Sequence, residues 1–140
     1  MAQPVLDLNL PDEAATSALG RSLATVCRPG DLIALTGDLG AGKSTLARAL
    51  IRELAGAEID VPSPTFTLVQ TYETPRLPVW HFDLYRLETP EQVFELGWEE
   101  ALAEGISIVE WPERLGPLLP KHLSVTLEVD DDGRRALFDV

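Results

Sequence analysis

The sequence predicts an α/β fold with a mostly parallel central sheet between layers of helices. An apolar run that turns through glycines into a helix, Asp31–Thr45, is typical of a strand followed by a helix that covers the sheet. A second run, Ile106–Val109, is apolar apart from Ser107, and we interpret it as the continuous apolar run expected for a central parallel strand. Alternating segments around turns, at Thr67–Tyr85 and Leu123–Val140, predict antiparallel hairpins added to this sheet, the second at the C-terminus.

The N-terminal segment predicts one strand and one long helix. Val5–Leu10 alternates apolar and polar residues, which indicates a half-buried strand. Pro11 suits the first turn of a helix, and an apolar stripe extends that helix from Pro11 to Cys27. Arg28-Pro29-Gly30 then ends it.

The stretch from Gly37 to Ser44 fits the pattern G-x-x-x-x-G-K-[ST] without a mismatch, after the strand Asp31–Thr36 and before a helix. Glycines let backbone N–H groups approach a phosphate closely, and the start of the next helix adds unpaired N–H groups and a positive dipole end. Lys43 adds a positive charge, and the Ser44 hydroxyl can ligate Mg²⁺. We expect phosphate contacts from Asp38, Leu39, Gly40, Ala41, Gly42, Lys43, Ser44 and Thr45.

This motif makes the predicted fold a three-layer domain of the P-loop NTPase type. The helix after it carries an apolar stripe at Leu46, Leu50 and Leu54, and Gly56 supplies a C-terminal stop. A glycine-rich turn before an ordinary helix is the alternative, which the strand–loop–helix context disfavours.

Ala57–Phe66 contains two prolines and no clear period, which predicts a loop. In P-loop switches, a loop at this location often carries a hydroxyl that senses Mg²⁺ and the γ-phosphate, and Thr65 and Ser63 are the candidates. A rigid connection shaped by Pro62 and Pro64 is the alternative, and position alone does not separate the two.

Thr67–Glu73 and Val79–Tyr85 predict the two strands of an antiparallel hairpin. In the second strand, alternation leaves His81, Asp83 and Tyr85 on one face. A histidine, a carboxylate and a phenol in one row suggest a functional site, and the alternative is the solvent-facing side of an edge strand.

Thr89-Pro90-Glu91-Gln92 has the form of a capping box with proline at the first helical position. We therefore expect a short helix that begins there and breaks at Gly97, with Trp98–Ala103 as its continuation.

The strand Ile106–Val109 ends in Glu110, and a carboxylate at the carboxyl end of a buried strand is the Walker B arrangement. Such a carboxylate can hold Mg²⁺, directly or through water, opposite the Ser44 hydroxyl, or polarise the attacking water. The alternative is a solvated strand end.

The segments Leu123–Val129 and Arg135–Val140 flank Asp130-Asp131-Asp132-Gly133, and Asp-Gly between alternating runs is the strongest short signal for a hairpin. The aspartates lack the spaced ligands and terminal glutamate of an EF-hand loop, so they predict a solvated turn.

The length of 140 residues and a hydrophobic fraction of 45% predict one domain over residues 1–140. With 11 basic and 23 acidic residues, the formal net charge is −12, so the chain should repel a free nucleic-acid backbone. Cys27 is the only cysteine, which excludes an internal disulfide and fits a small core residue in a reducing compartment. Neither a signal-peptide start nor a bilayer-length apolar run is present, which predicts a cytoplasmic location and no membrane contact.

Four segments in this order resemble the bacterial TsaE family, P-loop ATPases needed to make threonylcarbamoyladenosine in tRNA. They are Gly37–Thr45 for Walker A, Pro62–Phe66 for a switch-like loop, His81–Arg86 for an H-x-D-x-Y-R segment, and Val109–Trp111 for a Walker B-like glutamate followed by tryptophan. Walker A is shared with many families, whereas the other three are much more specific. The likeness covers nearly the whole chain, and Ser44, where many relatives carry threonine, is a small departure.

The resemblance implies a weak ATPase, dependent on ATP and Mg²⁺, that supports formation of threonylcarbamoyladenosine at position 37 of tRNAs that read codons starting with A. It also implies TsaD and TsaB as protein partners, whose assembly performs the transfer. The chain would then contact tRNA only indirectly, through these partners. A chain with a net charge of −12 agrees with leaving tRNA binding to partners.

With the resemblance, Lys43, Asp83 and Glu110 are the candidate catalytic residues. Ser44 and Glu110 are the expected Mg²⁺ ligands, and Asp83 and Thr65 are secondary candidates for the same metal. Asp83, in the middle of its strand pattern, is expected to act from the side, through a metal-bound water or by holding Thr65.

A small P-loop nucleoside or metabolite kinase is the main alternative, with Ala57–Phe66 binding the phosphoryl acceptor. Kinase lids usually bring several arginines to the transferred phosphate, and the candidates here are sparse: Arg86, Arg114 and Arg48. A guanine-nucleotide switch is disfavoured because the sequence has neither an [NT]-K-x-D segment nor a D-x-x-G after the second strand. A structural subunit with a vestigial site is disfavoured by the intact site residues.

Overall fold

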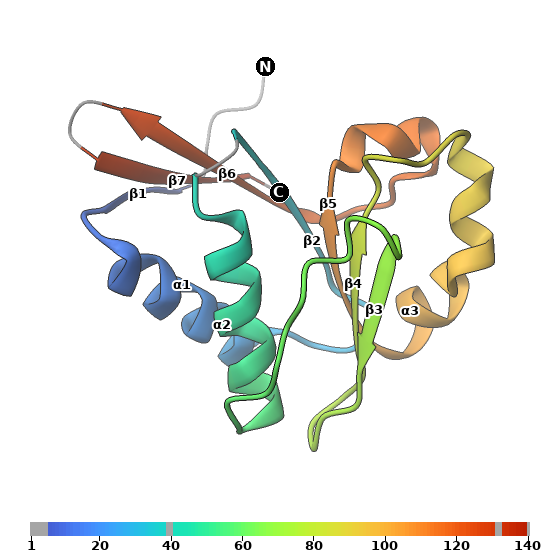
Figure 1. Cartoon of the computed structure of the whole chain (residues 1–140), viewed down its shortest axis with the longest axis horizontal. Helices are drawn as coiled ribbons and strands as arrows, with labels where there is room; N and C mark the ends of the chain where they lie inside the picture. Colours follow the sequence, from blue (N-terminus) through green and yellow to red (C-terminus); the bar gives the residue numbers. More distant parts are fainter. Residues whose placement is uncertain (1–5, 39–40, 131–132, 140) are drawn as a thin grey trace.

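The computed structural model describes residues 6–38, 41–130 and 133–139. These form a seven-stranded sheet with the order β1-β7-β6-β2-β5-β4-β3 (Figure 1). The strands are β1 (Leu6–Leu10), β2 (Leu32–Gly37), β3 (Val69–Tyr72), β4 (Val79–Asp83), β5 (Ile106–Glu110), β6 (Leu123–Asp130) and β7 (Gly133–Asp139). The neighbours β6, β2, β5 and β4 run parallel, whereas the β1–β7, β7–β6 and β4–β3 pairs are antiparallel. The predicted parallel centre with added antiparallel hairpins is confirmed.

Helices cover both faces of this sheet. The helices α1 (Glu13–Val26) and α2 (Lys43–Ala55) pack side by side on one face (Figure 1). On the other face lie α3 (Trp98–Glu104) and two 3₁₀ segments, η1 (Pro90–Leu96) and η2 (Pro112–Leu118), of which η2 was not predicted.

Alternate residues of the central strands contribute to two apolar cores. In β2, Ile33 and Leu35 pack with the buried stripes of α1 and α2, whereas Leu32 and Ala34 pack with residues of α3 and η1. Because β2 and β5 are covered on both faces, their sequences are mostly apolar, and Ser107, the polar residue within the β5 run, is itself buried.

The first helix begins later than predicted. Asp12 is its N-cap, since its Oδ1 accepts a hydrogen bond from Ala15 N at 2.8 Å. An aspartate cap satisfies one of the free N–H groups of the first turn, so Pro11 precedes the helix instead of opening it. The second helix ends at Gly56, as predicted.

The predicted capping box at Thr89 is wrong. The Gln92 N–H donates to the Thr89 carbonyl at 3.1 Å in a tight 3₁₀ turn, so it is not offered to the Thr89 hydroxyl. Gln92 Oε1 instead accepts from Glu88 N at 2.9 Å. The predicted break at Gly97 is confirmed, because this glycine separates η1 from α3.

The strand β4 is an interior strand. It pairs in parallel with β5 and antiparallel with β3, and His81 and Asp83 are only 3% and 5% exposed. The alternative of a solvent-facing edge row is therefore wrong for these two residues. The strand stops at Asp83, whose Oδ1 accepts from Tyr85 N at 3.1 Å, so Asp83 lies at the strand end and exposed Tyr85 lies beyond it.

The predicted C-terminal hairpin is formed by β6 and β7, and Asp131 and Asp132 of its predicted turn lie outside the described residues. The strand β1 pairs antiparallel with β7, which places the first strand of the chain beside the last.

Cys27, which directly follows α1, is buried in the apolar core, as a small core residue would be. Burial, reinforced by the nearby Asp31 carboxylate, raises the pKa of its thiol to about 11. Over the described ranges, no helix combines the length and apolar character needed to cross a bilayer.

Candidate functional site

The phosphate-binding motif lies between β2 and α2. Ala41 N donates to the Asp38 carbonyl at 3.0 Å, and Leu39 and Gly40 between them lie outside the described residues. Gly42 has a φ of 110°, and a Cβ there would also lie 3.3 Å from Thr16 Cγ2, so this position requires glycine. Because Gly42 has no side chain with which to cap α2, the first N–H groups of the helix stay available to an anion.

Parallel strand pairing brings two carboxylates to the sheet edge beside this motif. Leu35 of β2 lies opposite Glu110 of β5, and Glu110 lies opposite Asp83 of β4. The expected place of Glu110, beside the strand that delivers the loop, is confirmed. Asp83 occupies an equivalent strand end one strand further along, so the two carboxylates are neighbours.

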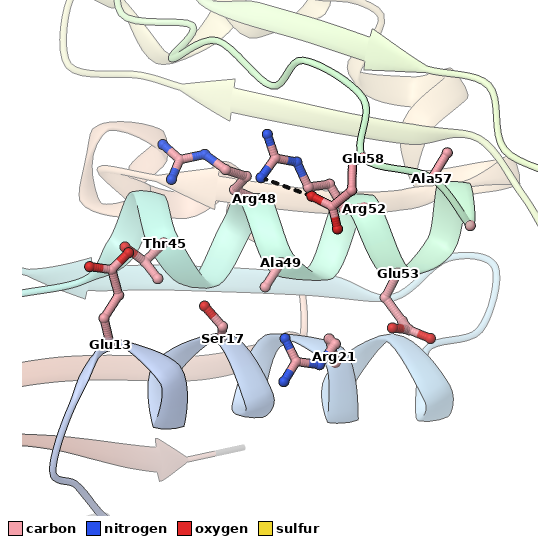
Figure 2. A pocket seen from close by; sticks show the side chains of 11 residues that line it. Glu13, Ser17, Arg21, Thr45, Arg48, Ala49, Arg52, Glu53, Ala57 and Glu58 are labelled. Atoms are coloured by element: carbon pink, nitrogen blue, oxygen red, sulfur yellow. Dashed lines mark ion pairs between the residues drawn. The ribbon is translucent and has the colours of Figure 1, made fainter.

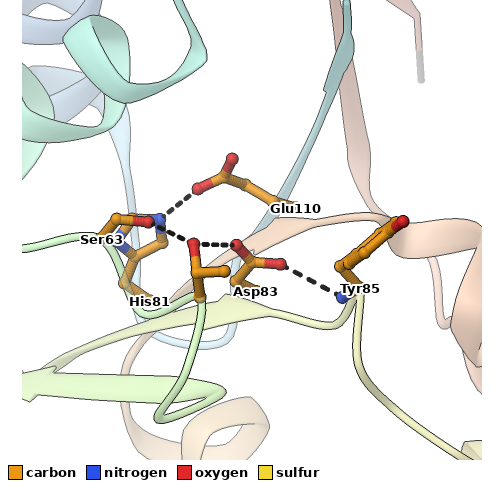
Figure 3. A network of polar contacts seen from close by, with 6 residues as sticks. Ser63, His81, Asp83, Tyr85 and Glu110 are labelled. Carbon is orange, nitrogen blue, oxygen red and sulfur yellow. Dashed lines mark hydrogen bonds and ion pairs between the residues drawn. The ribbon is translucent and has the colours of Figure 1, made fainter. Parts of the chain in front are cut away.

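Glu110 forms a buried pair with His81 (Figure 3). His81 Nε2 lies 2.8 Å from Glu110 Oε2, and the two side chains are only 4% and 9% exposed. In the β4–β5 register, His81 lies opposite Ile108, two residues before Glu110. The side chains of His81 and Glu110 therefore lie on the same face of the sheet. No pattern in either strand predicted this pair.

Asp83 connects β4 to the switch-like loop. The Thr65 hydroxyl donates to Asp83 Oδ2 at 3.1 Å, and the hydroxyls of Ser63 and Thr65 are 2.8 Å apart (Figure 3). Asp83 Oδ1 is occupied by Tyr85 N, so both carboxylate oxygens have partners. The expected contact between Asp83 and Thr65 is therefore present.

These side chains line one cavity of about 550 Å³. It contains the cation Lys43, the carboxylates of Asp83 and Glu110, and several hydroxyl groups. The hydroxyl-bearing residues are Ser44, Thr45, Ser63, Thr65 and Tyr85. The combination of a free helix start, one lysine and hard oxygen ligands suits a phosphate group with a divalent cation.

Aromatic rings form one wall of the cavity. The Tyr85 and Trp111 rings are in contact, with their centroids 4.8 Å apart and their planes tilted by 52°, and Lys43 Nζ lies 5.1 Å from the Trp111 ring centroid. Trp111 has a left-handed backbone, with φ of 60° and ψ of 49°, which is rare for a bulky residue. With this backbone conformation, the Trp111 ring lies beside Lys43, directly after Glu110.

Two of the predicted phosphate-binding residues have side chains elsewhere. Ala41 is fully buried in the core against α1 and α2, so only its backbone can contribute. The Asp38 side chain is exposed and lines a separate cavity beside β6 and β7.

Arg134 is a cavity residue that sequence reasoning missed. It belongs to β7, and its Nη1 would lie 3.7 Å from a Cβ placed on Gly42. No sequence motif marks this arginine, because only the pairing of β7 with β6 and β1 brings it to the start of α2.

A second cavity of about 530 Å³ lies along the outer surfaces of α1 and α2 (Figure 2). Its walls carry charges of both signs, and Arg52 is already engaged by Glu58 at 3.5 Å and by the Ile59 carbonyl at 2.9 Å. Of the predicted site residues only Thr45 reaches it, so the cavity at the sheet edge is the better candidate site.

The donor set of the sheet-edge cavity fits Mg²⁺ better than a transition metal. Within the described part of the chain, no three His, Cys, Asp or Glu residues gather in a group able to hold a metal on their own. Mg²⁺ commonly uses one or two protein oxygens together with phosphate oxygens and water, and the Ser44 hydroxyl with the Glu110 carboxylate meets that need.

Together, the parallel sheet, the glycine-rich loop before α2 and the carboxylates at the next strand ends define an α/β protein of the P-loop NTPase type. A family model described as threonylcarbamoyl adenosine biosynthesis protein TsaE matches residues 10–137. The chain therefore belongs to the TsaE family.

Individual relatives agree with this family. Proteins named tRNA threonylcarbamoyladenosine biosynthesis protein TsaE are similar to the chain: that of Rickettsia felis is 43% identical, covering 91% of this chain and 75% of the relative. Its Synechocystis counterpart is 44% identical over 87% of this chain and 79% of the relative. The crystal structure of Bacillus subtilis YdiB superposes with a TM-score of 0.80 at 29% identity, covering all of this chain and 87% of that one.

Proposed function

We propose that this chain binds and slowly hydrolyses ATP to support formation of threonylcarbamoyladenosine at position 37 of tRNAs that read codons starting with A. The relatives' names connect the family to this modification. TsaD and TsaB are the proposed partners that perform the transfer, and tRNA is reached through them.

One observation carries the proposal: Lys43 and Ser44, at the start of α2, share a cavity with two carboxylates at neighbouring strand ends. A nucleotide phosphate chain needs donors and cations on one side and a metal-holding oxygen set on the other. The cavity offers both within about 550 Å³.

In this proposal each residue has a distinct role. Lys43 leaves its position over the Trp111 ring to contact the phosphate oxygens, while the free N–H groups of α2 bind the same anion. Ser44 and Glu110 hold Mg²⁺, which supplies charge neutralisation when bound. Asp83 holds Thr65, and with it the switch-like loop, at the cavity rim.

The net charge of −12 supports leaving tRNA to partner proteins. Arg134 is the arginine nearest the helix start within the described chain, and we assign it to nucleotide binding in cis. Whether a further arginine in trans speeds hydrolysis is tested by adding the partners.

The decisive experiment measures phosphate release from ATP and from GTP, with the chain alone and with TsaD and TsaB added. We expect slow release from ATP alone, a changed rate with the partners, and little release from GTP. Phosphorylation of a small acceptor in place of phosphate release would favour a nucleoside or metabolite kinase. Equal rates with and without the partners would contradict the proposed coupling.

A further inference from the structure

His81 is a buried titratable residue that the roles above leave unused. It lies in the middle of β4, where Ile108, its register neighbour on β5, and Val79, two residues earlier on β4, both belong to the apolar core that includes α2. An aliphatic residue would pack there without any need for a partner. Burying a polar ring instead has a cost, which its single hydrogen bond to Glu110 must offset.

The pairing of the two side chains defines which ring nitrogen carries the proton. An ionised Glu110 carboxylate only accepts hydrogen bonds, so Nε2 must donate. The other nitrogen, Nδ1, is buried and has no hydrogen-bond partner among the described residues. A proton on Nδ1 would leave a buried N–H unpaired, so a ring that carries its proton on Nε2 fits the site best.

This bond restricts Glu110. The side chain has three rotatable bonds, and only its Oε2 is engaged by the ring, whereas Oε1 makes no hydrogen bond to the residues described here. Glu110 also lines the cavity that contains Ser44. Oε2 of Glu110 therefore binds to His81 of β4, and Oε1 remains available to a ligand in the cavity.

We propose that His81 is a positioning residue, which holds Glu110 in the orientation that presents one carboxylate oxygen to the metal or water beside Ser44. This inference rests on the proposed ATPase function and deepens it. The competing explanation is that His81 only fills space in the core. Under that explanation, a side chain of similar volume without the donor would serve equally well.

Two substitutions separate these explanations. His81→Leu removes the donor, whereas His81→Gln can place an amide N–H near the position of Nε2. His122→Gln is the matched control, because His122 is the only other histidine and its Nδ1 contacts the Pro120 carbonyl, away from the cavity.

For His81→Leu we expect kcat to fall on the order of tenfold to a hundredfold, while the Kd for ATP measured without metal changes less than about threefold. His81→Gln should recover most of kcat, and His122→Gln should match the wild type. Wild-type kcat in a folded His81→Leu variant would overturn the proposal. Equal losses in the Leu and Gln variants would overturn it too.

Two further readouts do not depend on hydrolysis. The imidazole ¹⁵N spectrum of the wild type should show the proton of His81 on Nε2, and a proton on Nδ1 alone would overturn the proposal. Mn²⁺ binding to the ADP complex, followed by electron paramagnetic resonance, should weaken in His81→Leu and in Glu110→Gln. The double variant should be no weaker than Glu110→Gln alone, since His81 acts through Glu110, and additive losses would contradict this.

If the wild type does not hydrolyse ATP even with the partners, the proposed function fails, while the ¹⁵N and Mn²⁺ measurements still decide the role of His81. If His81→Leu does not fold, His81→Gln and the wild-type spectrum decide it in the same way.

Discussion

Replacing Glu110 with glutamine tests the Walker B assignment most directly. The side chain keeps its shape, and its amide oxygen can still accept from His81 Nε2, which lies 2.8 Å from the present carboxylate oxygen. What is lost is the negative charge. Because Glu110 is only 7% exposed, water cannot compensate for the loss of this charge.

The substitution should change the free energy of unfolding only slightly. A hydrogen bond to a charged group contributes about 1.5–3 kcal/mol and a neutral one about 1 kcal/mol, so the pair with His81 weakens by about 1 kcal/mol. Removing a buried charge also removes its desolvation cost, which offsets part of this loss. We expect the melting temperature to change by less than about 4 °C.

The cost to hydrolysis should be large. A charge that acts on the metal or on the attacking water stabilises the transition state electrostatically. Losing one such interaction typically lowers kcat about a hundredfold or more. ATP should still bind, because Lys43 and the start of α2 are unchanged. Phosphate release and nucleotide binding are measured together, and Glu113→Gln, at an exposed position in η2, is the control.

An unchanged rate of hydrolysis with unchanged Mg²⁺ affinity would refute the reasoning. Asp83 would then take the role, since it occupies the equivalent end of the neighbouring strand.

Other predictions address the remaining parts of the site. Lys43→Ala should weaken ATP binding about tenfold to a hundredfold with the fold intact, and an unchanged affinity by calorimetry would remove the loop assignment. Asp83→Asn should lower both turnover and coupling to TsaD and TsaB, because the amide weakens the hold on Thr65; wild-type turnover with the partners would contradict this. The isolated chain should show no tRNA shift in a gel at physiological salt, and a salt-sensitive complex would reveal a basic face hidden by the net charge of −12. Cys27 should react with thiol reagents at pH 8 at least about tenfold more slowly in the native than in the unfolded chain, since a pKa raised to about 11 leaves less thiolate, and equal rates would count against its burial.

Local patterns predicted most of the strands and helices, because each depends on residues close in sequence. The continuous apolar run of β5 and the Asp-Gly signal before β7 both led to the observed elements. The errors are also local in origin. Pro11 suited a first helical turn, yet Asp12 caps the helix by accepting from Ala15 N, and at Thr89 the carbonyl accepts from Gln92 N in place of the hydroxyl.

The arrangement of the site was predictable only in part. Lys43 and Ser44 are identified by their motif, and Glu110 by its place at a strand end. The contact of His81 with Glu110 joins residues 29 positions apart and depends on the β4–β5 register, which no pattern in either strand reveals. The position of Arg134 beside the start of α2 depends on the order of strands across the whole sheet.

The edge pairing of β1 with β7 also has a consequence for synthesis of the chain. Among the described strands, β1 hydrogen-bonds only to β7, with Leu6 opposite Phe138, so β1 has no partner strand until β7 has been synthesised. Closing so long a loop has a larger entropic cost than forming a contact between residues close in sequence, so we expect this pairing to be a late step of folding. While the ribosome still holds the C-terminal segment, Leu6, Leu8 and Leu10 have no strand to pair with. A nascent chain stalled before β7 should therefore expose an unpaired strand, the kind of edge that chaperones and other nascent chains can capture.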